Sequence, residues 1–192
     1  PRATVLFSSF SGAVGVVAGQ IARIKGDRAV GVAGTDDKCR LLVNELGLDA
    51  AVKYKADTVY GDLREATPDR VDVIFDNVGG PLLDTLFRKL GIGARIIVSG
   101  ATSQYNNETI YGPTNYLALA TMRARMEGFI IFDYENRYQA ARAEMIEWLK
   151  RGDLKLVENM VDGEVGDYPN VLHRLYEGAN VGKMLLRLPA AN

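Results

Sequence analysis

The sequence has 192 residues, 47% of them hydrophobic, and its 23 basic and 24 acidic residues leave a formal charge of −1. These values predict one globular domain with a short appendage; they offer no basic face for nucleic acid and no run near the ~20 apolar residues that span a bilayer. The single cysteine, Cys39, excludes an internal disulfide. Together with the lack of a charged-then-apolar leader, it favours a soluble protein of the cytoplasm.

Apolar runs of strand length alternate with helical stretches, which is the pattern of a parallel sheet covered on both faces. The runs predict strands near residues 4–8, 29–34, 50–54, 71–76, 92–99 and 126–131. Right-handed crossovers make this an α/β doubly wound parallel sheet, the Rossmann fold, with strand order 3-2-1-4-5-6. Helical spacing predicts helices over 13–25, 38–46 and 134–150. The last of these is amphipathic, and its expected buried residues are Ala140, Ala141, Met145, Trp148 and Leu149.

The pattern changes after Gly152, which is expected to cap the helix 134–150. Strands over 154–161 and 183–188 flank a helix over 168–178, although the six-strand unit is already complete. We therefore divide the chain into a dinucleotide-binding domain, 1–152, and a return segment, 153–192, that belongs to a neighbouring domain or its interface. The abrupt start of the chain before the first strand favours a piece of a longer protein.

A glycine-rich turn separates the first predicted strand from its helix. It comprises Gly12, Ala13, Val14 and Gly15, in the spacing Ser9-x-x-Gly12-x-x-Gly15. Glycines there let the backbone approach a pyrophosphate, toward which the helix directs its free N–H groups and its positive dipole end. An ordinary strand-to-helix turn is the alternative, and Phe10 is bulky for a nucleotide-binding turn.

The end of the second predicted strand bears on the choice of cofactor. An acidic residue at that tip accepts hydrogen bonds from an adenosine ribose and repels a 2′-phosphate, but the tip here is Gly34. Thr35 offers a hydroxyl and Lys38 a positive charge, which favours NADP over NAD. Two alternatives stay open, because Asp36 has a spacing that an NAD-binding acid could use and Lys38 could be an ordinary surface lysine.

Small and polar residues follow the fourth and fifth predicted strands, beside the switch point of the sheet. Asn77 is expected to contact the ligand there, although Asn and Gly also form such turns for conformational reasons alone. After the fifth strand, small residues let the backbone approach a nicotinamide and its ribose, and a tyrosine hydroxyl ends the run. These residues are Ser99, Gly100, Ala101, Thr102, Ser103, Gln104 and Tyr105.

The composition offers no metal site and no hydrolase triad. His173, the only histidine, lies on an apolar helical stretch, and Cys39 is most simply a core residue. One histidine and one cysteine this far apart cannot supply a four-ligand zinc site without ligands from elsewhere.

Several motifs occur in order: 12–15 with 19–22, 34–39, 75–80, 99–106, 112–116, 127–134 and 178–183. In these motifs, and over nearly its whole length, the chain resembles the medium-chain dehydrogenase/reductase superfamily. Within it, the resemblance is to the zinc-free NADPH-dependent double-bond reductases, which include alkenal and prostaglandin/leukotriene reductases. It departs from them at Ser9-Phe10-Ser11, where small residues are usual, and at Lys53, which replaces an asparagine.

The resemblance implies cofactor contacts residue by residue. The turn 12–15 would meet the pyrophosphate, Lys38 the 2′-phosphate, Tyr54 the adenosine, and Asn77 the cleft. Residues 99–105 would line the nicotinamide half of the site. They would be joined there by Phe129, Ile130, Ile131 and, closing over the nicotinamide, Asn180.

The resemblance also implies a reaction, in which a hydride from NADPH goes to the β-carbon of an α,β-unsaturated carbonyl and the enolate is then protonated. Tyr105 would supply a hydrogen bond or a proton, or would only contact the ribose. The substrate-binding domain of the family is missing, and 154–161 and 183–188 would normally add strands to it. This chain alone is therefore expected to bind NADPH but to turn over poorly.

Alternatives to an enone or alkenal reductase are a quinone reductase of the same superfamily and a non-catalytic NADPH-binding module. A homodimer is expected through the strand 126–131, because that strand would otherwise leave an apolar edge open to pairing.

Overall fold

The computed structural model describes residues 2–10 and 12–190. Ser11, the first residue of the predicted domain 1–152 and the last two residues of the predicted segment 153–192 therefore lie outside the described residues. Its main sheet is parallel, with order β3-β2-β1-β4-β5-β6, as predicted. The strands are β1 (Thr4–Phe7), β2 (Arg28–Ala33), β3 (Ala50–Lys53), β4 (Val71–Asp76), β5 (Leu90–Val98) and β6 (Arg125–Gly128). β6 ends at Gly128, so residues 129–131 are not part of the strand as we had expected.

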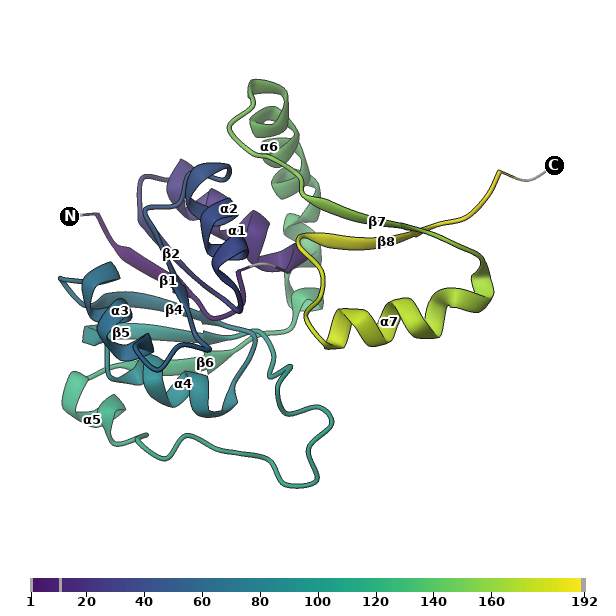
Figure 1. Ribbon diagram of the computed structural model, residues 1–192. Helices are drawn as coiled ribbons and strands as arrows, with labels where there is room; N and C mark the ends of the chain where they lie inside the picture. The colour runs from purple at the N-terminus through teal and green to yellow at the C-terminus, as the bar shows by residue number, and fades with distance from the viewer. Residues whose placement is uncertain (1, 11, 191–192) are drawn as a thin grey trace.

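Helices cover both faces of this sheet, and each face has its own apolar core (Figure 1). The helices are α1 (Ala13–Ile24), α2 (Asp36–Asn44), α3 (Val59–Ala66), α4 (Gly80–Phe87) and α5 (Ala118–Met122). One core forms beneath α3, α4 and α5, around Ile74 and Phe87. The other forms beneath α1 and α2, around Phe10 and Leu42. Because both faces are buried, the central strands are almost continuously apolar.

A long helix, α6 (Tyr138–Arg151), follows the 3-10 helix η1 (Ile131–Arg137), and Gly152 caps it in the left-handed conformation, as predicted. Its predicted apolar face is wrong in detail: Ala140 and Ala141 are exposed, Met145 and Leu149 are half-buried, and only Trp148 is buried. The helix lies outside the two cores and docks on α1 through Trp148, whose ring is 4.9 Å from the Lys25 ammonium.

The return segment forms a separate two-stranded parallel sheet, which projects from the side of the six-stranded one (Figure 1). The segment consists of β7 (Glu158–Asp162), η2 (Val165–Asp167), α7 (Tyr168–Tyr176) and β8 (Lys183–Arg187), close to the predicted ranges. A parallel bridge joins Gly182, just before β8, to Gly12 in the glycine-rich turn. The predicted boundary at 152/153 stays a prediction. Among the described residues, none of the helices is long and apolar enough to cross a membrane.

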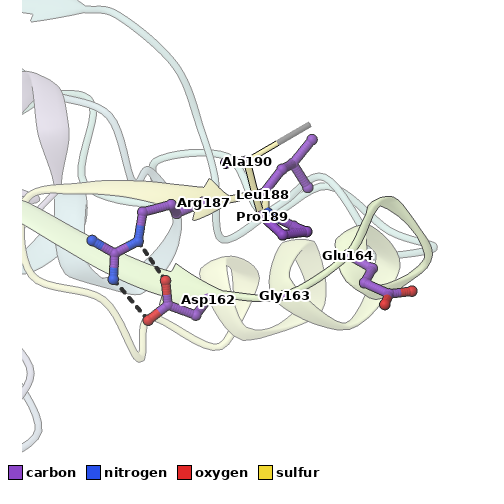
Figure 2. Close-up of a pocket in the computed structure, with 7 residues that line it drawn as sticks. All are labelled: Asp162, Gly163, Glu164, Arg187, Leu188, Pro189 and Ala190. Atoms are coloured by element: carbon purple, nitrogen blue, oxygen red, sulfur yellow. Dashed lines mark hydrogen bonds and ion pairs between the residues drawn. The ribbon is translucent and has the colours of Figure 1, made fainter. Parts of the chain in front are cut away.

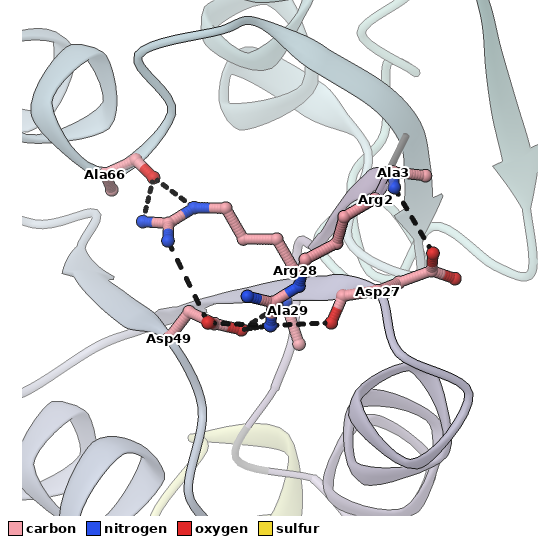
Figure 3. Close-up of polar contacts among 7 residues, drawn as sticks. All are labelled: Arg2, Ala3, Asp27, Arg28, Ala29, Asp49 and Ala66. Atoms are coloured by element: carbon pink, nitrogen blue, oxygen red, sulfur yellow. Dashed lines mark hydrogen bonds and ion pairs between the residues drawn. The ribbon is translucent and has the colours of Figure 1, made fainter.

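Polar contacts tie the amino ends of β1, β2 and β3 together (Figure 3). Asp49 accepts hydrogen bonds from the Arg2 guanidinium at 2.8 Å and from the backbone N–H of Ala29 at 2.9 Å. Arg28 donates to the carbonyl of Ala66 at 2.9 Å. This network fixes the amino ends of the three strands. Their carboxyl ends lie at the opposite edge of the sheet, where polar groups are available for a ligand.

Candidate nucleotide-binding site

A cavity of about 700 Å³ lies at the carboxyl ends of β1, β2 and β4. Twelve of the predicted site residues line it: Gly12, Ala13, Val14, Gly15, Thr35, Lys38, Tyr54, Asn77, Thr102, Ser103, Tyr105 and Asn180. They come from five separate strand ends, those of β1 to β5, and from the return segment. The parallel topology brings them together, since strands that run the same way end at the same edge.

The glycine-rich turn forms the floor of this cavity. Gly12 is the N-cap of α1, and as a glycine it has no side chain with which to cap the first N–H groups of the helix. Those groups and the positive end of the helix dipole suit an anionic ligand. Gly15 is required for close packing, because a Cβ there would stand 2.1 Å from the carbonyl oxygen of Ser9.

Phe10 is accommodated by turning away from the cavity. Its side chain is fully buried, and its ring packs edge-on against Phe7 with centroids 5.4 Å apart. The ring lies over two glycines: a Cβ at Gly19 would stand 1.8 Å from Phe10 Cε2, and one at Gly31 would stand 3.0 Å from Phe10 Cβ. The backbone N–H of Phe10 donates to Val32 at 3.1 Å. A bulky residue therefore fits in this turn because α1 and β2 provide space for it.

Positive charge gathers at the tip of β2. Lys38 and Lys55 both line the cavity, and burial together with the charge of Lys55 lowers the pKa of Lys38. The Lys38 ammonium donates to the carbonyl of Gly178 at 2.6 Å. Gly34 leaves room at the tip, where a Cβ would lie 3.5 Å from the Tyr54 ring and 3.9 Å from Lys55 Cε. This end of the cavity suits a phosphate next to an aromatic ring.

The Thr35 hydroxyl caps α2 by accepting from the backbone N–H of Lys38 at 3.3 Å. Asp36, the candidate NAD-binding acid, does not line the cavity; its carboxylate pairs with the Lys53 ammonium at 2.8 Å. The hydrogen bond from Lys53 lowers the pKa of Asp36.

The other end of the cavity is formed by the turns after β4 and β5. The turn after β5 is fixed to the one after β4 by hydrogen bonds from Thr102 and Ser103 to the carbonyls of Asn77 and Val78, at 2.7 to 3.1 Å. A Cβ on Gly100 would stand 2.5 Å from Asn77 Oδ1 and 2.8 Å from the Tyr105 hydroxyl. An amide oxygen and a phenol thus converge above Gly100, beside the cavity.

Seven predicted contacts do not line the cavity: Ser99, Gly100, Ala101, Gln104, Phe129, Ile130 and Ile131. Gln104 is a buried structural residue that donates to the Ser103 hydroxyl at 2.7 Å and accepts from the N–H of Tyr111 at 2.8 Å. Ile130 and Ile131 lie on the surface after β6, with 60% and 55% of each side chain exposed. Their contact with a nicotinamide stays a prediction.

Other lining residues were not predicted. Leu175 and Tyr176, at the end of α7, line the cavity together with Glu177 and Gly178, which follow the helix. Nothing in the local sequence of Leu175, Tyr176 and Glu177 marks them, because they reach the cavity only through the placement of the return segment, whereas Gly178 opens the motif 178–183. Asn180, which was predicted, is buried there and donates to the carbonyl of Gly182 at 2.8 Å.

Asp84 on α4 holds the loop that follows Tyr105, and it was not predicted either. It accepts hydrogen bonds from the hydroxyls of Tyr111 and Thr114, both at 2.7 Å, and from the N–H of Thr114 at 3.0 Å. Burial acts to raise the pKa of Asp84, but these hydrogen bonds outweigh it and the net shift is downward. The loop is therefore fixed by a charged acceptor.

A second hollow, of about 630 Å³, lies at the far ends of β7 and β8, where Arg187 pairs with Asp162 at 2.8 Å (Figure 2). It contains none of the predicted site residues. Across residues 2–10 and 12–190, no group of three or more His, Cys, Asp and Glu side chains could hold a metal ion. His173 is exposed and contacts Glu177 at 3.5 Å.

The chain is similar in sequence to several curated proteins. The chain is 39% identical over 184 residues to a 2-alkenal reductase (NADP(+)-dependent) of Nicotiana tabacum, covering 95% of this chain and 53% of that protein. It is 37% identical over 191 residues to an NADPH-dependent curcumin reductase of Escherichia coli, covering 96% of this chain and 55% of that one. The chain thus spans about half the length of these curated relatives.

One solved structure is similar to the chain in both fold and sequence. CurA of Vibrio vulnificus in complex with NADPH superposes with a TM-score of 0.92 at 35% identity, over all of this chain and 59% of that one. The family profile described as zinc-binding dehydrogenase matches residues 13–151. The chain therefore belongs to the zinc-binding dehydrogenase family, within the medium-chain dehydrogenase/reductase superfamily.

Proposed function

We propose that this chain binds NADP(H) across the 700 Å³ cavity and supplies the nucleotide half of a carbon–carbon double-bond reductase. The observation that carries the proposal is the order of groups along the cavity. In the strand order β3-β2-β1-β4-β5, Tyr54, Thr35 and Lys38 follow the strands on one side, the glycine-rich turn follows β1 in the middle, and Asn77 and Tyr105 follow β4 and β5 on the other side. A 2′-phosphate, a pyrophosphate and a nicotinamide ribose need groups of these kinds in this sequence.

The proposed substrate class is an α,β-unsaturated carbonyl. Alkenal and curcumin reductases are among the relatives, and bound NADPH supplies the hydride in such a reaction. Tyr105 would hold a proton or a hydrogen bond for the carbonyl oxygen, on which negative charge develops. Its hydroxyl accepts from the N–H of Ala101 at 3.3 Å, which fixes the position of the phenol and leaves its own proton available to a ligand.

The remaining part of the site is proposed to come from a substrate-binding domain that this chain does not contain, because the relatives are nearly twice as long. β7 and β8 support this division, since they form a small sheet apart from the six-stranded one. The family description names zinc, but the described residues do not fit a zinc site. No step of the proposed reaction is assigned to a metal.

We further propose a homodimer through β6. This strand is at the edge of the sheet, and all four of its residues are exposed, Met126 among them. Pairing of two such edges would continue the sheet across a two-fold axis. The cytoplasm stays the predicted location, on the basis of the single cysteine, which is free.

The test of the function is reduction of an enone by NADPH with the full-length protein that carries this chain, in wild-type form and as Tyr105→Phe. If the Tyr105 hydroxyl acts mainly in the transition state, kcat falls about ten- to a thousandfold with little change in NADPH affinity. Tyr168→Phe is the control, because Tyr168 is similarly exposed but lies outside the cavity. Failure of the wild type to reduce any enone would refute the proposed reaction.

A further inference from the structure

An ion pair between Lys53 and Asp36 lies beside the tip of β2. Lys53 ends β3 and pairs in register with Ala33, the last residue of β2. Its ammonium donates to Asp36 Oδ2 at 2.8 Å. Neither side chain lines the cavity, although Thr35, one residue before Asp36, and Lys38, two residues after it, both do.

The position of Asp36 makes its charge important for the choice of nucleotide. Asp36 is the first residue of α2, directly after the N-cap Thr35, and its side chain is 65% exposed. A carboxylate at this end of the helix would repel a 2′-phosphate held by Lys38, and it could accept hydrogen bonds from a free ribose diol. A mobile Asp36 would therefore favour NADH over NADPH.

Lys53 counteracts both effects. It holds the carboxylate on the β3 side of the strand tip, and its positive charge offsets the negative one. Arg40 pairs with Asp37 on the surface of α2, and its charge adds to the hydrogen bond from Lys53 in lowering the pKa of Asp36. The hydrogen bond to Asp36 raises the pKa of Lys53, and the charge of Asp62 acts on Lys53 in the same direction. Glu177, the residue after α7, lines the cavity next to Gly178, whose carbonyl accepts from Lys38, so Lys38, Lys55 and Glu177 are the charged groups of the cavity on this side.

We propose that Lys53 is a specificity-determining residue that acts through Asp36: by holding and neutralising this carboxylate, it shifts the cavity from NADH towards NADPH. Lys53 is a positioning residue and does not itself contact the phosphate. This inference rests on the proposed function, because it assumes that a dinucleotide occupies the cavity with its 2′ position at the tip of β2.

The test is a double-mutant cycle, in which Kd values for NADPH and NADH are measured by calorimetry at low ionic strength. The variants are Lys53→Met, Asp36→Asn and the pair together, with Lys53→Arg as the conservative replacement. Lys53→Met should weaken NADPH binding by about three- to tenfold, the size expected of one exposed charge near a phosphate, and should not weaken NADH binding. In the Asp36→Asn background the same change should alter NADPH affinity by less than about twofold.

Lys53→Arg should retain the wild-type preference, because it keeps both charge and donor. Lys150→Met is the control, since Lys150 forms an exposed ion pair with Glu147 at 2.9 Å on α6 and should affect neither nucleotide. Equal weakening of NADPH binding with and without Asp36 would overturn the inference, as would no effect of Lys53→Met. If the wild type binds NADPH, the proposed function stands whatever the effect of Lys53→Met. If the wild type binds neither nucleotide, the proposed function itself is refuted.

Discussion

The substitution Gly19→Ala should destabilise the chain, although alanine is normally the better helix residue. Gly19 is buried in the middle of α1, under the ring of Phe10. The added methyl would stand 1.8 Å and 2.1 Å from Phe10 Cε2 and Cζ. The ring cannot move away easily, because it is fully buried and also packs on Gly31 and Phe7.

The magnitude follows from two opposing effects. Replacing glycine by alanine within a helix stabilises by about 1 kcal/mol when the site is open. Overpacking a dense core costs about 1–3 kcal/mol, and separations this short place Gly19→Ala at or above the upper end of that range. The net loss of unfolding free energy should be about 2 kcal/mol. Phe10→Leu removes the two clashing ring atoms, at its own cost of about 1–2 kcal/mol.

The assay is urea unfolding of the wild type, both single variants and the double variant. In the Phe10→Leu background, Gly19→Ala should no longer destabilise the chain, and its effect on the unfolding free energy should be neutral or stabilising. Gly61→Ala is the control, because Gly61 lies on α3 with open space around it. Gly26→Ala is not suitable, because Gly26 has a positive φ of 92°. If Gly19→Ala were neutral in the wild-type background, the packing of Phe10 described above would be incorrect.

Three further predictions concern the site and its support. Lys38→Ala should weaken NADPH binding about tenfold, the value of a pair worth ~1–2 kcal/mol, and leave NADH binding unchanged; equal loss for both nucleotides in titrations would contradict the assignment. Asp84→Asn should lower the unfolding free energy by about 1–3 kcal/mol at neutral pH. Because folding lowers the pKa of Asp84, its contribution is present above the unfolded value of about 3.9 and is lost as pH falls through the folded value. In denaturant titrations, the stability difference between the variant and the wild type should therefore shrink progressively as pH falls below about 4, and a constant difference would exclude this charge. Light scattering should report a dimer at micromolar concentration, and a monomer would exclude pairing through β6.

The strand order could be predicted because its evidence is local. Each of the six strands is a short apolar run bounded by turn residues, and the handedness of the crossovers leaves one common order. The carboxyl ends of those strands then indicate where the cavity lies, and Asn77 and Tyr105, predicted from their place after β4 and β5, both line it.

The parts that could not be predicted depend on contacts between distant residues. The expected strand ends early, at Gly128: Phe129 and Ile130 belong to no regular element and a 3-10 helix begins at Ile131, although Ile130 and Ile131 are typical strand residues. The apolar face of α6 was overestimated because amphipathic spacing indicates a preferred face, not whether a partner covers it. Asp84 was missed for a similar reason, since its partners Tyr111 and Thr114 lie some 30 residues further along the chain.

The contact between Lys38 and Gly178 joins two parts of the chain that are 140 residues apart. An ammonium has three N–H donors, so a phosphate and the Gly178 carbonyl can share Lys38. The affinity for nucleotide then depends on where the return segment is held. By thermodynamic linkage, nucleotide binding must stabilise that placement to the same extent. A domain that binds β7 and β8 would thereby change the affinity for the cofactor without contacting the cofactor.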